Sequence, residues 1–290
     1  MASQRTATLA GLAAILLWAS LAVLTTATGN LPPFQVLAVS FGIAALLGLA
    51  RAALRGAAGW RELRQPGAAL ALSTLALFGY HALYFIALKR APAVEANLLN
   101  YLWPLLIVVF AGLVGGVTVR AGQWAGTLLG LVAAALLVTR GHGLQVDRAH
   151  VPGYLAALGA AVIWAAYSVL NRRFADVPTA AITVACAGVA VLGAAVHLLF
   201  ERTVAPGAAQ WLVLAVMGAG PVGAAFWLWD HGTKRGDIAL LGSLSYLAPL
   251  LSTLLLVVSG RAEPHGIQAV AIAMLLAGAW LSVRSSRAAR

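Results

Sequence analysis

Apolar stretches long enough to cross a lipid bilayer follow one another along almost the whole 290-residue chain. A helix needs about 20 apolar residues to span roughly 30 Å of hydrocarbon, so ten such helices would use about 200 residues. Because 62% of the residues are hydrophobic and only 9% are charged, the sequence lacks the polar surface of a soluble globule. It therefore predicts an all-α membrane protein and argues against soluble enzymes, disordered proteins and fibrous proteins.

Proline and glycine residues divide the apolar sequence into ten predicted spans. Pro32-Pro33, Pro206-Gly207 and Glu263-Pro264 are examples of these interruptions, because such residues end helices and favour turns. We expect the spans at residues 7–27, 34–50, 68–88, 94–116, 121–139, 152–171, 179–200, 209–232, 238–258 and 266–283.

Lys and Arg residues gather on one side of this predicted arrangement. If the spans alternate in direction, thirteen of the 19 lie on the side that carries both termini, and six lie on the other side. Cytoplasmic loops of membrane proteins are rich in Lys and Arg, so we expect a multi-pass protein with both termini in the cytoplasm. The same loops explain the net charge of +11. Without a dense basic and aromatic patch, that charge does not indicate nucleic-acid binding.

The two halves of the sequence resemble each other at an offset of 145 residues. Around Tyr101 and Tyr246, nine of 24 aligned positions are identical, including a Lys-Arg pair and a Tyr-Leu-x-Pro-Leu motif. Each half holds five predicted spans, an odd number, so the second half would enter the membrane from the opposite side. The sequence thus predicts two five-helix domains, residues 1–145 and 146–290. They would form inverted repeats around a central cavity, as is typical of secondary transporters.

Polar side chains at helical spacing make the fourth and ninth spans the first part of a candidate binding site. Asparagine is costly in lipid, so the shared face of these residues should look into a wet cavity. Proline frees a backbone carbonyl and can kink its helix. The alternative is that the polar groups only hydrogen-bond neighbouring helices. The expected site residues here are Asn97, Asn100, Tyr101, Ser245 and Tyr246, with helix kinks at Pro104 and Pro249.

Aromatic residues deep in other spans extend this candidate site. Aromatic walls offer apolar area, ring stacking and cation–π contacts to an ammonium group, which suits a zwitterionic solute. Core packing is the alternative for any single ring, and His81 could instead be a hydrogen-bonded interior residue or a proton carrier. We expect substrate to contact Trp18, Tyr80, His81, Tyr84, Trp103, Trp164, Tyr167 and Ser168.

Acidic residues are scarce, and none lies clearly at mid-depth. Asp230 and Lys234 stand at i and i+4, which favours an ion pair at the membrane edge. This scarcity favours facilitated diffusion or exchange over proton coupling, although coupling through His81 stays open. No metal-ligand cluster or hydrolase motif is present, so we expect no cofactor, no metal and no enzymatic activity.

Glycines at Gly126 and Gly130 form a small-xxx-small face on the fifth span. Such a face permits close approach of two helices. We favour packing within the chain over a dimer face, and therefore expect a monomer or weak dimer in the lipid bilayer.

The chain resembles the drug/metabolite transporter superfamily, in its ten-helix EamA-type branch. The resemblance rests on Trp18 and Trp164, on Lys-Arg-Ala-Pro-Ala at 89–93, and on Leu-x-Tyr-Leu-x-Pro-Leu at 99–105 with its echo at 244–250. Within that branch the chain is most similar to the YddG amino-acid exporters. The residues that carry this narrower similarity are Tyr80, His81, Tyr84 and Asn-Leu-Leu-Asn-Tyr-Leu-Trp-Pro-Leu at 97–105.

The resemblance implies export of amino acids from the cytoplasm across a bacterial inner membrane. We expect broad specificity for aromatic and other apolar or small amino acids, and facilitative alternating access. The second half departs from the first, with Ala248 opposite Trp103 and Gly242 opposite Asn97, so the site should be lopsided. The alternatives are an exporter of another small metabolite or drug in the same superfamily, a proton-coupled carrier using His81, an intramembrane enzyme and a passive channel.

Overall fold

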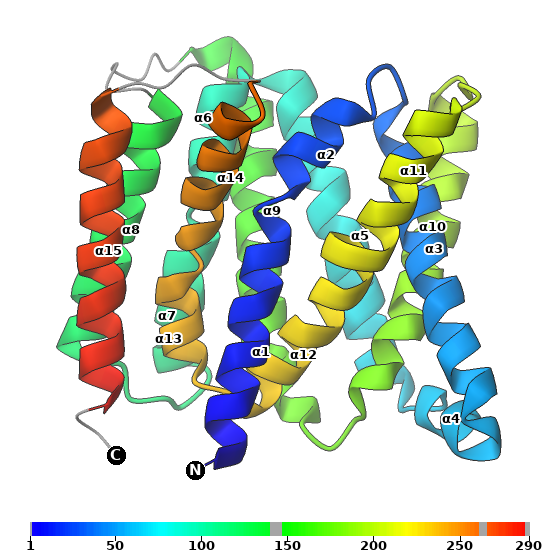
Figure 1. Cartoon of the computed structure of the whole chain (residues 1–290), viewed down its shortest axis with the longest axis horizontal. Coiled ribbons are helices and arrows are strands. Elements are labelled where there is room, and N and C mark those ends of the chain that lie inside the picture. Colours follow the sequence, from blue (N-terminus) through cyan, green and yellow to red (C-terminus); the bar gives the residue numbers. More distant parts are fainter. Residues whose placement is uncertain (1, 140–146, 261–265, 288–290) are drawn as a thin grey trace.

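A computed structural model describes residues 2–139, 147–260 and 266–287. These residues form helices and connecting turns and contain no strand. Figure 1 shows the long helices side by side. The principal helices are α1 (Ala2–Trp18), α2 (Leu21–Ala27), α3 (Pro33–Leu54), α4 (Gly56–Leu63), α5 (Gly67–Arg90), α6 (Ala93–Asn100), α7 (Trp103–Leu113), α8 (Ala121–Thr139), α9 (Val151–Leu170), α10 (Ile182–Phe200), α11 (Ala208–Met217), η4 (Gly218–Ala224), α12 (Ala225–Arg235), α13 (Ile238–Leu244), α14 (Leu247–Val258) and α15 (Gly266–Arg287).

Within the described residues, nine helical stretches are long and apolar enough to cross a membrane. A shorter apolar helix, Ala121–Leu136, lies where the fifth span is predicted. Helices dominate because apolar residues fill each stretch, and in lipid a helix satisfies its own backbone hydrogen bonds. The prediction of an all-helical membrane protein is confirmed at this level.

Several predicted spans consist of more than one helix. The first is divided between α1 and α2, the fourth between α6 and α7, and the ninth between α13 and α14. Pro104 and Pro249 lie in the first turn of α7 and α14, after the breaks at Tyr101-Leu102 and Ser245-Tyr246. Proline has no N–H and is tolerated in a first turn, so each helix restarts just before its proline.

The eighth span contains a π-helical segment, η4, between α11 and α12. Pro221 lies inside it and cannot donate a backbone hydrogen bond. π-Helical turns inside α-helices are often found at functional sites. The segment packs against α3 and lies at the end of α1.

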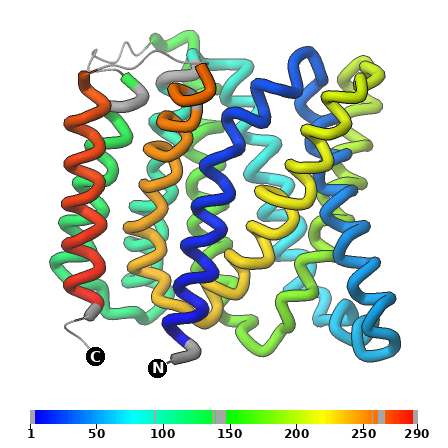
Figure 2. Tube along the Cα trace, viewed as in Figure 1, coloured from blue at the N-terminus to red at the C-terminus, as the bar shows by residue number. Residues whose placement is uncertain are grey.

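The four most extensive helix–helix contacts are those of α8 with α15, α3 with α10, α5 with α9, and α1 with α12 (Figure 1). Each pair joins one helix of the first half to one of the second. The start of α1 and the end of α15 lie at the same edge of the bundle, which we call the terminal edge (Figure 2). The opposite edge is called the far edge.

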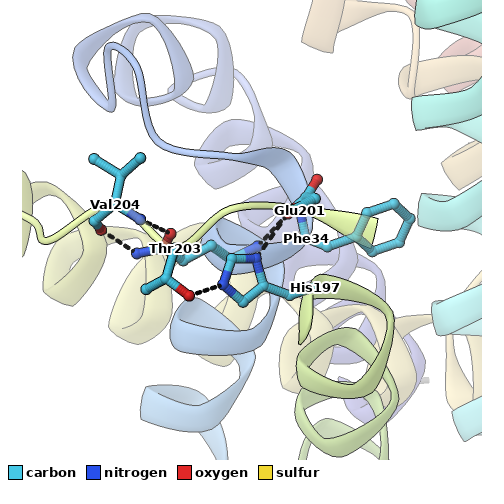
Figure 3. A network of polar contacts seen from close by, with 6 residues as sticks. Phe34, His197, Glu201, Thr203 and Val204 are labelled. Atoms are coloured by element: carbon cyan, nitrogen blue, oxygen red, sulfur yellow. Dashed lines mark hydrogen bonds and ion pairs between the residues drawn. The ribbon is translucent and has the colours of Figure 1, made fainter. Parts of the chain in front are cut away.

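A polar network at the far edge fastens α10 to the start of α3 (Figure 3). The Glu201 carboxylate accepts hydrogen bonds from the backbone N–H groups of Phe34 and Gln35 at 3.1–3.2 Å. His197 contacts the same carboxylate through Nδ1 at 2.9 Å and Thr203 through Nε2 at 2.9 Å. A carboxylate is stabilised at a helix N-terminus, so Glu201 fixes where α3 begins.

Glycine contacts hold α8 against its neighbours. A Cβ added at Gly126 would lie 2.3 Å from the carbonyl oxygen of Gly278 in α15, and one at Gly130 would lie 2.4 Å from the Tyr246 ring. The small-xxx-small face therefore packs within the chain.

We expect Gly126→Ala to destabilise the protein by about 1–3 kcal/mol, because the added methyl group must push α8 away from α15. The measurement is the apparent free energy of unfolding in mixed micelles. Gly67→Ala is the control, since no atom lies within 4 Å of its added Cβ. Equal stability of the two variants would contradict the close α8–α15 contact.

Candidate functional site

Four tryptophans from four helices meet at the centre of the bundle. Trp18 ends α1, Trp103 begins α7, Trp164 lies in α9 and Trp229 lies in α12. All pairs among them have ring centroids 5.1–6.5 Å apart, in edge-to-face, tilted or stacked geometry. Such contacts add to the stability that burial alone provides. We call these four residues the tryptophan cluster.

Hydrogen bonds fix the orientation of two of these rings. The Trp18 indole N–H donates to the carbonyl oxygen of Pro221 at 3.0 Å, which ties α1 to η4. The Trp229 indole N–H donates to Ser168 Oγ at 3.1 Å, and that hydroxyl donates to the carbonyl oxygen of Trp164 at 2.9 Å. Ser168 thus holds Trp229 in place. Trp18 is half-buried, whereas the other three tryptophans are buried.

A second group of polar residues adjoins the tryptophan cluster. Tyr80 and Tyr84 of α5 stack with ring planes 8° apart, and the Tyr80 ring lies 5.5 Å from Trp164. The Tyr84 hydroxyl donates to Asn97 Oδ1, and Asn100 Nδ2 donates to the Tyr80 hydroxyl at 3.2 Å. We call Tyr80, Tyr84, Asn97 and Asn100 the tyrosine–asparagine group.

Asn100 Oδ1 is buried and has no hydrogen-bond partner within the described part of the chain. Leaving a buried carbonyl group unpaired costs about 1–3 kcal/mol. An acceptor held open beside three other polar side chains suits a ligand that donates hydrogen bonds.

His81 lies next to this group but among phenylalanines. Its Nδ1 is 2.7 Å from the carbonyl oxygen of Leu77, and its ring centroid is 5.2 Å from Phe41 and 6.2 Å from Phe226. A carbonyl can only accept, so Nδ1 carries a proton, and in the neutral ring Nε2 remains an acceptor.

Tyr246 of the ninth span is separate from the tryptophan cluster, although Leu241 and Leu244 of the same span pack in the core that holds the tryptophans. Tyr246 is fully buried in a different apolar cluster with Ala133 of α8 and Leu275 of α15. The Ser245 hydroxyl donates to the carbonyl oxygen of Leu241 in its own helix at 2.7 Å. Two predicted site residues remain. The ring centroids of Tyr167 and Trp164 are 5.6 Å apart, and Tyr101 lies half-buried at the α6–α7 break.

Two aromatic residues of the site, Trp229 and Phe226, are missing from the sequence prediction. The 145-residue offset could have identified them, because it places Trp229 opposite Tyr84 and Phe226 opposite His81. The polar half of the site therefore comes from α5 and α6, and the α12 positions that match Tyr80, His81 and Tyr84 of α5 are apolar or aromatic.

Asp230 and Lys234 form the predicted ion pair, with Lys234 Nζ 2.9 Å from Asp230 Oδ1 near the end of α12, and the structure shows in addition that the pair is buried. Their side chains are only 1% and 4% exposed. Asp230 also accepts hydrogen bonds from Asn171 and Thr179 at 2.8 and 2.7 Å, and Lys234 donates to the carbonyl oxygen of Val177 at 3.1 Å. The segment between α9 and α10 folds over the pair and excludes solvent.

In the described ranges no group of three or more His, Cys, Asp or Glu side chains lies close enough together to hold a metal ion. The arrangement instead offers aromatic faces, a few directed polar atoms and a largely apolar surround. Sites for small organic ligands have this character.

Comparison with known proteins relates the whole chain to membrane transporters. The model of the EamA-like transporter family matches residues 5–139 and 151–284. The chain is 48% identical over 286 residues to the aromatic amino acid exporter YddG of Ancylobacter novellus, covering 98% of this chain and 99% of that protein. It is 28% identical to the aromatic amino acid exporter YddG of Escherichia coli, covering 87% and 88%. A crystal structure with 47% identity superimposes with a TM-score of 0.92, covering 98% of this chain and 99% of the other.

Proposed function

This chain belongs to the EamA-like transporter family, and from that premise we propose that it exports amino acids, aromatic ones among them, out of the cytoplasm. Two aromatic amino acid exporters match it over most of their length, which supports this substrate class. Both come from bacteria, so the proposed location is a bacterial inner membrane. The excess of Lys and Arg at the side of the termini supports a cytoplasmic position for both ends.

The observation that carries the proposal is the open acceptor of Asn100 beside a wall of aromatic rings. An amino acid presents an ammonium group that donates hydrogen bonds and attracts aromatic faces. Asn100 Oδ1 would accept from this ammonium, and the Tyr80 and Trp164 rings would contact the substrate's apolar side chain. Ring contacts depend on area rather than on directed bonds, so a broad range of side chains fits such a site.

We further propose that residues 1–145 and 146–290 are inverted five-helix repeats that alternate access to this site. The family model matches once in each half, which supports two units. The packing pattern supports their relation. In the repeat, α1 corresponds to α9, α3 to α10, α5 to α12 and α8 to α15. The α3–α10 and α8–α15 contacts therefore each join two corresponding helices, and the α5–α9 contact has its counterpart in the α12–α1 contact. The α6–α7 and α13–α14 breaks also fall at equivalent Tyr101 and Tyr246, where two half-spans could tilt.

We propose that transport is facilitative, driven by the gradient of the amino acid itself and not coupled to an ion. Buried Asp230 already forms an ion pair with Lys234 and accepts two hydrogen bonds, which supports a structural role rather than a role in proton coupling. A proton-coupled carrier that uses His81 would instead require a pH gradient for accumulation.

The test is counterflow of labelled phenylalanine in proteoliposomes without a pH or voltage gradient, with threonine and methionine in parallel. We expect saturable counterflow, and a KM for phenylalanine that rises by about tenfold or more in Asn100→Ala, because one hydrogen bond to a charged group is lost. Asn30→Ala, at an exposed turn, is the matched control. Wild-type flux that never saturates would indicate a channel, and flux that requires a pH gradient would indicate proton coupling.

A further inference from the structure

A pocket of about 300 Å³ opens near the terminal edge, between the C-terminal ends of α7 and α9. Val114 and Gly115 line it from the end of α7, and Val169 and Leu170 line it from α9. Two arginines that follow α9, Arg172 and Arg173, complete the lining. Its volume is at the lower end of the range for small-molecule sites, and it fits a ligand of amino-acid size.

The two arginines differ in how they are held. Arg172 is half-buried, and its Nη1 donates to the carbonyl oxygens of Thr233 at 2.8 Å and Gly236 at 3.3 Å, which fixes the guanidinium beside the end of α12. Arg173 is exposed. Neither forms a salt bridge with a carboxylate in the described ranges. Asp237 lies near enough to Arg172 to interact with it electrostatically, whereas Arg173 forms no ion pair in the described ranges. The pocket therefore combines an apolar wall with two guanidinium groups, of which Arg173 is the one without a carboxylate partner.

The two helices that line the pocket also carry two members of the tryptophan cluster. Val169 is five residues beyond Trp164 along α9, a rise of about 8 Å. The other wall belongs to α7, whose first residue is Trp103. The same two helices thus connect the pocket with the proposed substrate site.

The substrate site itself lacks a partner for a carboxylate. No side chain of the tryptophan cluster or of the tyrosine–asparagine group carries a positive charge. A zwitterionic solute could place its ammonium and its side chain there, but its carboxylate would find no cation. Arginine is the side chain whose planar donors match a carboxylate.

We propose that this pocket is an oxyanion site that holds the carboxylate of an amino acid arriving from the terminal edge, before the solute moves up to the tryptophan cluster. The inference rests on the proposed amino-acid transport. A phospholipid phosphate has the same oxyanion chemistry, and anionic lipids attract Arg at the cytoplasmic surface. The experiment therefore separates the two sources.

Arg173→Gln is the test variant, because the Arg173 side chain is exposed and forms no ion pair in the described part of the chain. Arg148→Gln, an exposed arginine next to the start of α9 at the far edge, removes the same charge as a control. Counterflow of phenylalanine is measured with the terminal edge facing the added solute. Two inhibitors are compared: 3-phenylpropionate, which has the carboxylate but no ammonium, and phenethylamine, which has the ammonium but no carboxylate.

We expect Arg173→Gln to raise the KM for phenylalanine and the inhibition constant of 3-phenylpropionate by about threefold to fivefold, the size typical of an exposed charge contact. The inhibition constant of phenethylamine should stay unchanged, as should all three values in Arg148→Gln. Added salt should weaken phenylalanine binding in the wild type more than in the variant.

Three results would overturn the substrate assignment. If all three constants are unchanged while wild-type counterflow is normal, the pocket does not contact the solute. If phenethylamine is affected as strongly as 3-phenylpropionate, the arginine only supports the end of α9. If the effect of the variant appears in vesicles with phosphatidylglycerol and vanishes in phosphatidylcholine alone, the oxyanion belongs to a lipid. Absence of saturable counterflow in the wild type would contradict the proposed function instead.

Discussion

Lys234→Met will destabilise the protein by about 3–5 kcal/mol, and Asp230→Asn by a similar amount, whereas the double variant will recover most of that loss. Each single substitution leaves one charge buried without its partner, which is the costly state of a buried ion pair. The double variant keeps a neutral amide whose oxygen can accept from Asn171 and whose NH2 group can donate to the Thr179 hydroxyl, so mainly hydrogen-bond strength is lost. The measurement is the apparent free energy of unfolding in mixed micelles.

The exposed pair of Arg55 and Glu62 provides the matched control. These side chains lie 2.7 Å apart but are 43% and 26% exposed, so Arg55→Met should cost at most about 1 kcal/mol. If Lys234→Met and Arg55→Met have equal effects, Asp230 and Lys234 are hydrated, and the segment between α9 and α10 does not cover them. If the double variant is as unstable as each single one, packing rather than charge sets the cost.

Spacing rules predicted some features of this site because they depend only on neighbouring residues. The i, i+4 spacing predicted the Asp230–Lys234 pair, and helical spacing predicted that Asn97 and Asn100 share one face, which the structure turns toward Tyr84 and Tyr80 of α5. The depth of the pair was not predictable, because its burial depends on Thr179 and Val177, which arrive from another segment.

The ninth span shows why a sequence repeat does not guarantee an equivalent environment. Tyr246 matches Tyr101 in the aligned halves, yet it packs over Gly130 of α8, and Tyr101 lies half-buried at its helix break. The contacts of an aromatic ring depend on the helix that packs beside it, and the 145-residue offset does not predict which helix that is. For Trp229, by contrast, the offset alone would have indicated a site residue, because Trp229 aligns with Tyr84 of the predicted site.

Trp164→Ala will reduce kcat/KM for phenylalanine counterflow by more than about tenfold. Trp164 contacts the other three members of the tryptophan cluster as well as Tyr80 and Tyr167, so its removal takes away the ring that joins the aromatic wall to the tyrosine–asparagine group. Truncating a buried tryptophan also costs about 3–5 kcal/mol of stability. Flux must therefore be normalised to folded protein, measured by size-exclusion chromatography and thermal unfolding.

Trp164→Phe separates the loss of a ring from the loss of packing. A phenyl ring keeps an aromatic face toward the substrate but leaves a smaller gap, so we expect counterflow within about threefold of the wild type. Trp211→Ala, at a side chain that is 49% exposed, should leave counterflow unchanged. If folded Trp164→Ala transports phenylalanine normally, the tryptophan cluster is only a packing core, and the solute must pass along Asn97 and Asn100 without touching it.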